Sequence, residues 1–291
     1  MRSADGGGAP GVPGVPGVPG MLRCAVVGDP IEHSLSPALH RAGYDALGLD
    51  ARYDAIRVPA EGLASFVAGL DAGRDGWRGL SVTAPLKREA LELATIVSER
   101  ALLAGGANTL VRHEDGWAAD NTDLPGAVAA VRERYDGPVG VVTIIGAGAT
   151  AASTGLALAE LGARTVRLLA RDPARAQETV TALRRDPRIE VDVVPLEEAA
   201  VVGEVVVSTI PVAAQSASLV AATATAAAVF EVVDDPWPSP IAAAALARGQ
   251  ALVSGLDLLV HQAVLQFALF TGHDGPLGIM RAAGERALAQ R

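Results

Sequence analysis

The chain of 291 residues contains a single cysteine, Cys24, so it cannot form an internal disulfide bond. It also lacks any Cys/His cluster with the spacing of a structural zinc site. Aromatic residues are scarce at 3%, while 50% of the residues are hydrophobic and 20% are charged, which indicates a globular chain with an aliphatic core. With 24 basic against 33 acidic residues, the net charge of −9 argues against a nucleic-acid binder. These features favour a cytoplasmic protein without a bound metal.

The first 20 residues lack the side chains needed to form a core, because they include seven glycines and four prolines. The repeat Gly-Val-Pro occurs three times up to Gly20, which predicts a disordered tail over residues 1–20. This tail has no apolar segment of the kind found in a signal peptide. We expect the folded chain to begin at Met21.

No membrane-spanning segment is expected, although residues 137–159 and 205–230 carry no charge. Each stretch is as long as the roughly 20 residues that cross a bilayer as a helix. Glycines interrupt the first stretch and Pro211 interrupts the second. Each consists of a short β-branched run, a turn and an Ala-rich segment, which is typical of a buried parallel strand followed by its helix.

Hydrophobic periodicity alternates between strand and helix along the chain and predicts two α/β domains with parallel sheets. The first set comprises strands near 22–28, 52–58 and 78–82, helices near 36–47, 60–72 and 124–135, helical sequence over 89–103, and a hairpin over 108–121 around an Asp-Gly turn. The breaker Asp136-Gly137-Pro138 marks a boundary. The second set comprises strands near 139–145, 164–170, 189–194, 204–209, 228–233 and 251–253, helices between most of them, and a helical C-terminus from Leu256.

The segment after the strand at 139–145 has the G-x-G-x-x-G/A pattern of a dinucleotide-binding loop. Its residues are Gly146, Ala147, Gly148, Ala149, Thr150 and Ala151. Gly146 permits a tight turn, Gly148 lets the backbone approach a pyrophosphate, and Ala151 allows close helix packing. Free N–H groups at the start of the next helix face the phosphates in such a site. Because the pattern lies between a strand and a helix, it favours a cofactor site over a plain Gly-Ala turn.

The end of the next strand predicts which cofactor binds. NAD enzymes tend to place an acidic residue there to hold the ribose hydroxyls. Here Arg171 ends the strand and Arg175 follows one helical turn later, so two guanidinium groups are available for a 2′-phosphate. The plainer alternative is a pair of solvated surface arginines, and Asp172 offers a carboxylate that could serve a ribose instead. We expect NADP, with NAD as the less favoured alternative.

Small polar residues gather in segments near the strand ends. The segments are G-D-P-I-E-H-S-L-S-P-A-L-H at 28–40, L-S-V-T-A-P-L-K at 80–87, A-N-T at 107–109, A-D-N-T-D at 119–123 and G-L-D-L-L-V-H-Q-A at 255–263. In this order around the glycine-rich loop, they resemble the shikimate dehydrogenase family, from about Leu22 to the C-terminal helices.

The resemblance implies an NADP-dependent enzyme that interconverts 3-dehydroshikimate and shikimate in aromatic amino-acid biosynthesis, by way of chorismate. It implies a substrate-binding domain over 21–123, a Rossmann NADP-binding domain over 124–255 and a cleft between them. Helices over 256–291 would pack back on the substrate domain. The oligomeric state is left open, with a homodimer as one reading.

The resemblance also assigns roles to individual residues. Ser34 and Ser36 would bind the substrate carboxylate with help from Thr83. Asn108 and Asp123 would bind the ring hydroxyls, and Gln262 would reach the substrate from the C-terminal helix. Lys87 and Asp123 would form the catalytic pair, and Val232 and Gly255 would contact the cofactor.

The chemistry of the residues agrees with these roles. Hydride addition to a ketone leaves an alkoxide, and the Lys87 ammonium can stabilise that charge and supply the proton. Plainer interpretations stay open: Lys87 as a surface lysine at a helix start, Asn108 as a strand cap and Gln262 as a surface helical residue. Ser36 before Pro37 is typical of a helix N-cap, which is compatible with binding a carboxylate.

Some positions depart from the family pattern. Asp234 stands where the family usually has a tyrosine, and its negative charge would face an anionic substrate group. Ser81 replaces a common asparagine, and Ala170-Arg171-Asp172 replaces Asn-Arg-Thr. The alternatives are therefore a dehydrogenase for quinate or an aminated shikimate analogue, or a ligand-binding paralogue with little turnover.

Overall fold

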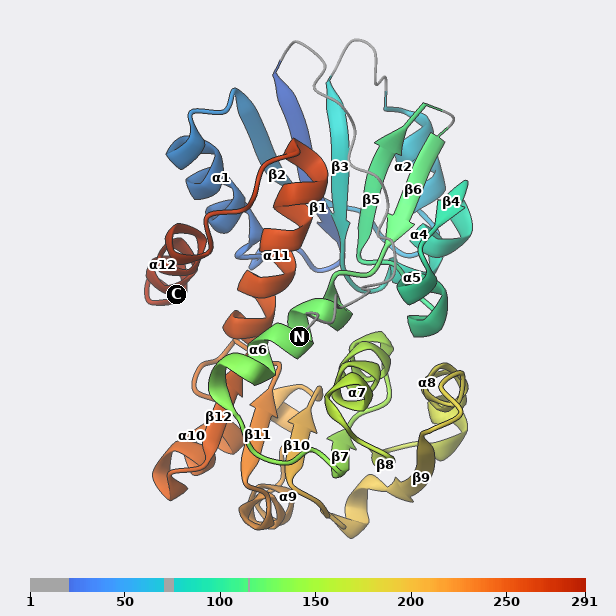
Figure 1. Ribbon diagram of the computed structural model, residues 1–291, viewed down its shortest axis with the longest axis vertical. Helices are drawn as coiled ribbons and strands as arrows, with labels where there is room; N and C mark the ends of the chain where they lie inside the picture. Colours follow the sequence, from blue (N-terminus) through green and yellow to red (C-terminus); the bar gives the residue numbers. More distant parts are fainter. Residues whose placement is uncertain (1–20, 71–75, 115) are drawn as a thin grey trace, which may run out of the picture.

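The computed structural model describes residues 21–70, 76–114 and 116–291, so the predicted tail over 1–20 lies outside the described part. Two sheets of six strands each build the molecule, one above the other in Figure 1. Helix α6 (Asp123–Arg134) and the lower end of helix α11 (Gly255–Thr271) lie between them. The expected pair of α/β layers is present.

The first sheet is mixed rather than parallel. Its strands, in the order β2-β1-β3-β5-β6-β4, are β2 (Ala51–Arg57), β1 (Leu22–Gly28), β3 (Trp77–Val82), β5 (Thr109–His113), β6 (Gly116–Asp120) and β4 (Ile96–Val97). β1 runs parallel to β2 and β3, whereas β5 is antiparallel to both β3 and β6. The tight β5–β6 hairpin explains part of the difference, because a short turn reverses the chain and parallel pairing needs a longer crossover.

The second sheet is entirely parallel, as expected. Its strands, in the order β12-β11-β10-β7-β8-β9, are β12 (Ala251–Ser254), β11 (Ala228–Glu231), β10 (Val205–Ser208), β7 (Val141–Ile145), β8 (Thr165–Ala170) and β9 (Glu190–Pro195). Read from the β9 edge, the order is that of a doubly wound dinucleotide-binding fold, with its switch point between β7 and β10. Ligands bind such sheets at the carboxyl ends of the strands beside the switch point.

The remaining helices cover the two sheets. They are α1 (Ser36–Leu47), α2 (Leu63–Ala68), α4 (Lys87–Leu93), α5 (Glu99–Ala104), α7 (Ala149–Leu161), α8 (Gln177–Leu183), α9 (Ala217–Ala222), α10 (Pro240–Arg248) and α12 (Leu277–Leu288). The uncharged stretches divide into β7 and α7, and into β10, α9 and β11. Within the described ranges, no helix is long and apolar enough to span a membrane.

Two predicted helices differ from the structure. The helix expected over 60–72 begins only at Leu63, because Glu61 has a positive φ of 65°. The helical sequence over 89–103 is two helices separated by β4. Ser98 has extended backbone and its hydroxyl accepts the Ala101 N–H, so it begins α5 as a true N-cap.

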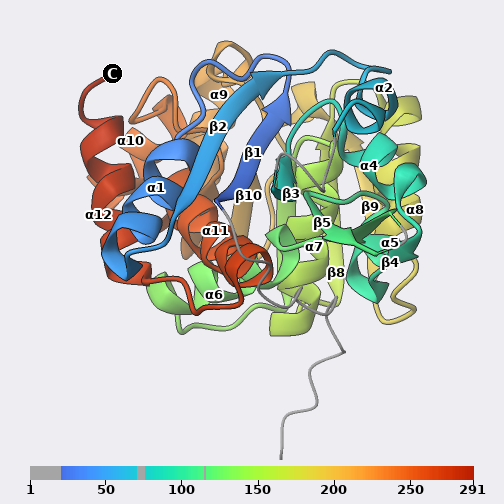
Figure 2. The ribbon, with the colours of Figure 1, turned by 90° about the horizontal axis from the view of Figure 1, so that it is seen from above.

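The C-terminal helices pack against the first sheet. Figure 2 shows α1, α11 and α12 side by side, and Phe267 and Phe270 of α11 join the core cluster that contains Val26 of β1. Phe270 fills the space over Gly79, where a Cβ atom would lie 2.1 Å from its ring. Helix α11 therefore runs from the end of β12 in the second sheet to the core of the first.

Candidate active site

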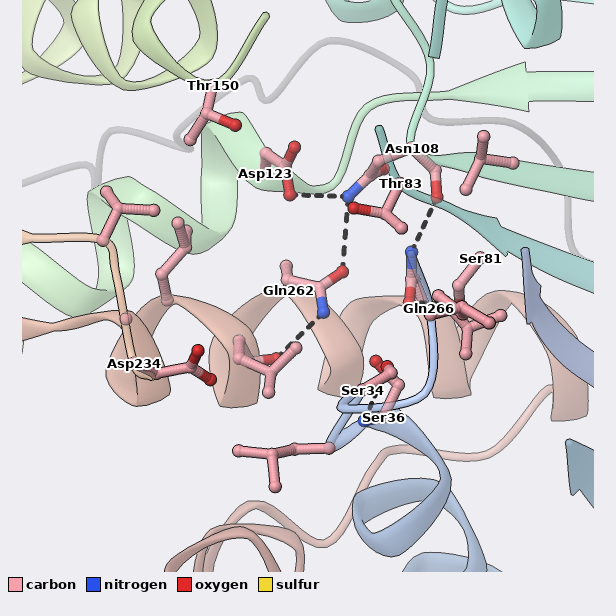
Figure 3. Close-up of a pocket in the computed structure, with 18 of the residues that line it drawn as sticks. Ser34, Ser36, Ser81, Thr83, Asn108, Asp123, Thr150, Asp234, Gln262 and Gln266 are labelled. Carbon is pink, nitrogen blue, oxygen red and sulfur yellow. Dashed lines mark hydrogen bonds between the residues drawn. The ribbon is translucent and has the colours of Figure 1, made fainter. Parts of the chain in front are cut away.

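A cavity of about 370 Å³ lies between the two sheets. All seven residues predicted to act on the substrate line it: Ser34, Ser36, Thr83, Lys87, Asn108, Asp123 and Gln262. Figure 3 shows Gln262 projecting from α11 toward Asn108 and Asp123, with Ser34 and Ser36 lying below. The fold thus gathers positions from both ends of the sequence into one site.

Ser34 and Ser36 occupy the turn between β1 and α1. The Ser34 hydroxyl accepts the Ser36 N–H at 3.3 Å, and α1 begins at Ser36 itself. Leu35 occupies the N-cap position without a side-chain hydrogen bond, so the prediction of Ser36 as N-cap is wrong. The two hydroxyls line the cavity beside the start of α1, and hydroxyl groups can donate hydrogen bonds to a carboxylate.

Lys87 and Asp123 form an ion pair at the cavity wall. The Lys87 Nζ lies 2.6 Å from Asp123 Oδ2, and the two side chains are 13% and 9% exposed. Lys87 is the first residue of α4, and Asp123 is the first residue of α6. The N-terminal ends of these two helices therefore fix the position of the ion pair. The interpretation of Lys87 as a solvated surface lysine is therefore wrong.

Asn108 holds the other oxygen of Asp123. Its Nδ2 donates to Asp123 Oδ1 at 2.8 Å and to Gln262 Oε1 at 3.3 Å. The Thr122 backbone N–H donates to Asn108 Oδ1 at 2.8 Å, which fixes which end of the amide faces Asp123. Gln262 is 6% exposed, so it is not the surface residue of the plainer interpretation, and Asn108, directly before β5, is 3% exposed.

Helix α11 approaches α6 closely at Gln262. A Cβ atom on Gly126 of α6 would lie 2.9 Å from both the Cβ and the backbone N of Gln262. This glycine allows the two helices to meet, and the contact sets Gln262 beside Asp123.

Several residues that line the cavity were absent from the predicted site, among them Ser81, Gln266 and Asp234. Gln266 lies one helical turn after Gln262, so the four-residue spacing on one helix was a signal for it. Ser81 and Asp234 were noticed only as departures from a family pattern.

Asp234 lies in the loop after β11 and its carboxylate faces the cavity (Figure 3). Burial raises the pKa of Asp234, and the positive charge of Arg291 opposes that shift. The Arg291 guanidinium is 3.9 Å from the Asp234 carboxylate and also donates to the carbonyl of His33, beside Ser34. A cation therefore partly offsets the negative charge on this side of the cavity.

The glycine-rich loop leads into α7 as predicted. Gly146 has a φ of 113°, which favours glycine, and Gly148 is the N-cap of α7. Ala151 is fully buried, in keeping with close helix packing. Thr150, Val232 and Gly255 line the cavity that holds the substrate residues, so the start of α7 reaches its wall.

Two further cavities flank this loop. One, of about 320 Å³, is lined by Ala147, Gly148 and Ala149, and the other, of about 250 Å³, by Gly146, Ala147 and Arg171. Asp172 also lines the second, but its carboxylate accepts the Ala174 N–H as an N-cap. Arg171 is exposed at this wall, while the side chain of Arg175 lies outside the described part.

Comparison with known proteins gives matches along most of the chain. The profile of the shikimate dehydrogenase substrate binding domain matches residues 26–110, and that of the shikimate 5′-dehydrogenase C-terminal domain matches 255–283. Between them, residues 141–232 match a profile described as NADP oxidoreductase coenzyme F420-dependent.

Individual proteins are similar over nearly their whole length. A curated shikimate dehydrogenase (NADP(+)) of Anaeromyxobacter sp. is 36% identical over 266 residues, which cover 89% of this chain and 94% of that protein. The structure of Mycobacterium tuberculosis shikimate dehydrogenase is 38% identical, with a TM-score of 0.79 and coverage of 92% and 99%. The structure of quinate dehydrogenase from Corynebacterium glutamicum in complex with NAD is 27% identical, with a TM-score of 0.80 and coverage of 91% and 99%.

Proposed function

The chain belongs to the shikimate dehydrogenase family, and we propose on this premise that it catalyses the reversible NADP(H)-dependent reduction of 3-dehydroshikimate to shikimate. The observation that carries the proposal is the Lys87–Asp123 ion pair. It lines the same cavity as Thr150 of α7 and Val232 in the loop after β11, which lie on the nucleotide-binding side. A proton donor and the cofactor side of the cleft therefore border one space.

The residues of the second sheet fit NADP. A Cβ atom on Gly148 would meet nothing within 4 Å, so the backbone there is open to a pyrophosphate. The N-terminus of α7 offers its unpaired N–H groups to phosphate oxygens, and Arg171 offers a guanidinium for a 2′-phosphate. When bound, NADPH supplies the hydride. Asp172 lines the same cavity and caps the next turn with one carboxylate oxygen, so it is Arg171 that favours NADP over NAD.

The first sheet supplies the substrate contacts. Ser34, Ser36 and Thr83 line the region that suits the carboxylate, where hydroxyl groups adjoin the start of α1. Asn108 and Gln262 suit the ring hydroxyls, because amide groups both donate and accept hydrogen bonds. These contacts orient the ketone toward the nucleotide side of the cavity.

Lys87 carries the acid–base step. Its ammonium donates a hydrogen bond to the ketone oxygen and transfers a proton as that oxygen gains negative charge. Asp123 orients the ammonium through the 2.6 Å contact and accepts a hydrogen bond from a substrate hydroxyl. In the reverse direction, the neutral amine accepts the proton from the hydroxyl of shikimate.

We assign the substrate domain to 21–123, the NADP domain to 124–255 and the C-terminal helices to 256–291, and we place the enzyme in the cytoplasm. The residues that we assign to the reaction all belong to this chain.

The test is the appearance of NADPH at 340 nm when purified protein is mixed with shikimate and NADP. We expect turnover with this pair to exceed turnover with quinate or with NAD. Faster turnover of quinate with NAD would overturn the proposal and make the protein a quinate dehydrogenase.

Asp234 favours a second candidate, a dehydrogenase for an aminated shikimate analogue. A carboxylate in the cavity wall attracts an ammonium and repels a carboxylate. Arg291 opposes this effect, which is why shikimate is the first choice.

Replacing Asp234 with asparagine distinguishes the two candidates. For shikimate we expect the KM to fall about fivefold, because one nearby like charge costs about 1 kcal/mol in a solvated site. For an aminated substrate, the KM would rise by a similar factor. Asp235→Asn is the matched control, since Asp235 is 47% exposed and does not line the cavity.

A further inference from the structure

A continuous line of buried hydrogen bonds runs from β2 along the wall of the cavity to Asp123. We call it the relay. Its members, in order, are Tyr53, Ser81, Gln266, Thr109, Asn108 and Asp123. Tyr53 Oη lies 2.5 Å from Ser81 Oγ, and Ser81 Oγ lies 2.6 Å from Gln266 Oε1. Gln266 Nε2 is 2.9 Å from Thr109 Oγ1, which is 2.7 Å from Asn108 Oδ1.

The chemistry of the groups fixes the direction of each bond. Gln266 Nε2 also donates to the backbone carbonyl of Asn108 at 2.9 Å, which orients the Gln266 amide. Its Oε1 can then only accept, so Ser81 donates to it and accepts from Tyr53. Thr109 accepts from Gln266 and donates to Asn108 Oδ1, whose orientation the Thr122 N–H has fixed.

Every donor therefore points the same way, toward Asp123. Tyr53 and Thr109 are fully buried, and Ser81, Gln266 and Asn108 are no more than 5% exposed. Burial raises the pKa of Tyr53, so its hydroxyl stays protonated and remains a donor. Aligned hydrogen bonds in such a setting polarise one another, which strengthens the later bonds in the line.

We propose that Gln266 is a positioning residue for substrate recognition, which acts through Thr109 and Asn108 and is itself held by Ser81. This inference rests on the proposed function, because Asn108 is assigned to a substrate hydroxyl. Gln266 holds both the backbone carbonyl of Asn108 and the hydroxyl that contacts its side chain. Its loss leaves the Asn108 amide less constrained, while the Lys87–Asp123 contact is retained.

A purely structural role for Gln266 predicts something different. Removing a buried amide would then lower the stability without changing the substrate affinity relative to the cofactor affinity. Gln266 lies on the substrate side, and the cavities beside the glycine-rich loop do not include it. The ratio of the two affinities therefore separates positioning from stability.

The experiment compares Ser81→Ala, Gln266→Leu and the double variant in the full chain. We measure KM for shikimate, KM for NADP and kcat, together with the Kd for shikimate by calorimetry. Gln266→Leu should raise the KM and Kd for shikimate about tenfold, in line with the loss of a buried hydrogen-bonding partner, and leave the KM for NADP within twofold. The double variant should bind shikimate no more weakly than Gln266→Leu does, because both substitutions interrupt the same line of hydrogen bonds.

Thr223→Val is the matched control. Thr223 is fully buried, its hydroxyl donates to the Val220 carbonyl, and it lies in the second sheet's outer layer away from the cavity. This variant should lose stability and keep its KM for shikimate.

Two results would overturn the positioning role: an unchanged shikimate KM and Kd in Gln266→Leu, or single-variant effects that add in the double variant. If the wild-type protein does not turn over shikimate, the proposed function is contradicted instead. The Kd for shikimate of the wild type and of Gln266→Leu then still tests the positioning role.

Discussion

Replacing Lys87 with alanine is expected to lower kcat about 10³-fold, because the reaction loses both its proton donor and the positive charge beside the ketone oxygen. KM for shikimate should change little, since the hydroxyls and amides that line the rest of the cavity remain. Initial rates of NADPH formation with shikimate measure both constants. Calorimetric binding of shikimate shows that the variant cavity is still formed.

The control is Arg188→Ala, which removes a 59% exposed cation that pairs with Asp186 and lines none of the three cavities. Its rates should equal those of the wild type. Equal rates for wild type and Lys87→Ala, with intact ligand binding, would instead support the reading of the chain as a binding protein with little turnover. Such a protein would still be stabilised by ligand.

Replacing Asp257 with alanine is expected to lower the free energy of unfolding by about 3 kcal/mol, because the change breaks a buried ion-pair cluster. The Asp257 carboxylate accepts from Arg134 at 2.7 Å and from Arg281 at 2.5 Å. It also accepts the Ser254 N–H at 2.9 Å, which completes a capping box at the start of α11. Urea unfolding measures the loss, and Asp54→Ala, in an exposed pair, should change it by less than about 1 kcal/mol.

The same carboxylate makes the stability depend on pH. Burial alone raises the pKa of Asp257, but hydrogen bonds from Arg134, Ser254 and Arg281 outweigh it and lower the pKa to about 2. The unfolded pKa is about 3.9, so the folded state favours the ionised form. The resulting stabilisation, on the order of 2 kcal/mol, is present above pH 4 and is lost as the pH falls from about 4 to 2. Asp257→Ala should therefore flatten the dependence of the free energy of unfolding on pH over that range. If the variant instead shows the same pH dependence as the wild type, Asp257 is not its source.

The sequence allowed much of the fold and the site to be predicted, for identifiable physical reasons. Parallel strands in the second sheet are buried on both faces and appear as continuous apolar runs, and the glycines after β7 mark the one turn that must approach a phosphate. Lys87 and Asp123 belong to short polar segments that follow strands, and it was the resemblance to a known family that proposed them as a pair. Strand ends carry the functional groups in α/β folds.

The errors lie where local sequence does not determine the structure. Residues 89–103 have helical composition, but pairing of Ile96-Val97 with β6 interrupts the helix, and that tertiary contact has no local signal. The N-cap at Ser36 was wrong because the turn after β1 sets where α1 begins. Gln266 was missed despite its four-residue spacing from Gln262, because its hydrogen-bond partners Ser81 and Asn108 lie more than 150 residues away along the chain.

The helices that end the chain complete the core of the strands that begin it. Val26 and Leu39, made early in synthesis, share one apolar cluster with Phe267 and Met280, made at the end. Synthesis proceeds at about 5–20 residues per second. The core of the first sheet therefore stays incomplete while the whole second sheet leaves the ribosome and becomes able to fold. The second sheet should therefore reach its native structure before the first sheet does. Truncation within α11 should leave the apolar face of the first sheet uncovered and prone to aggregate.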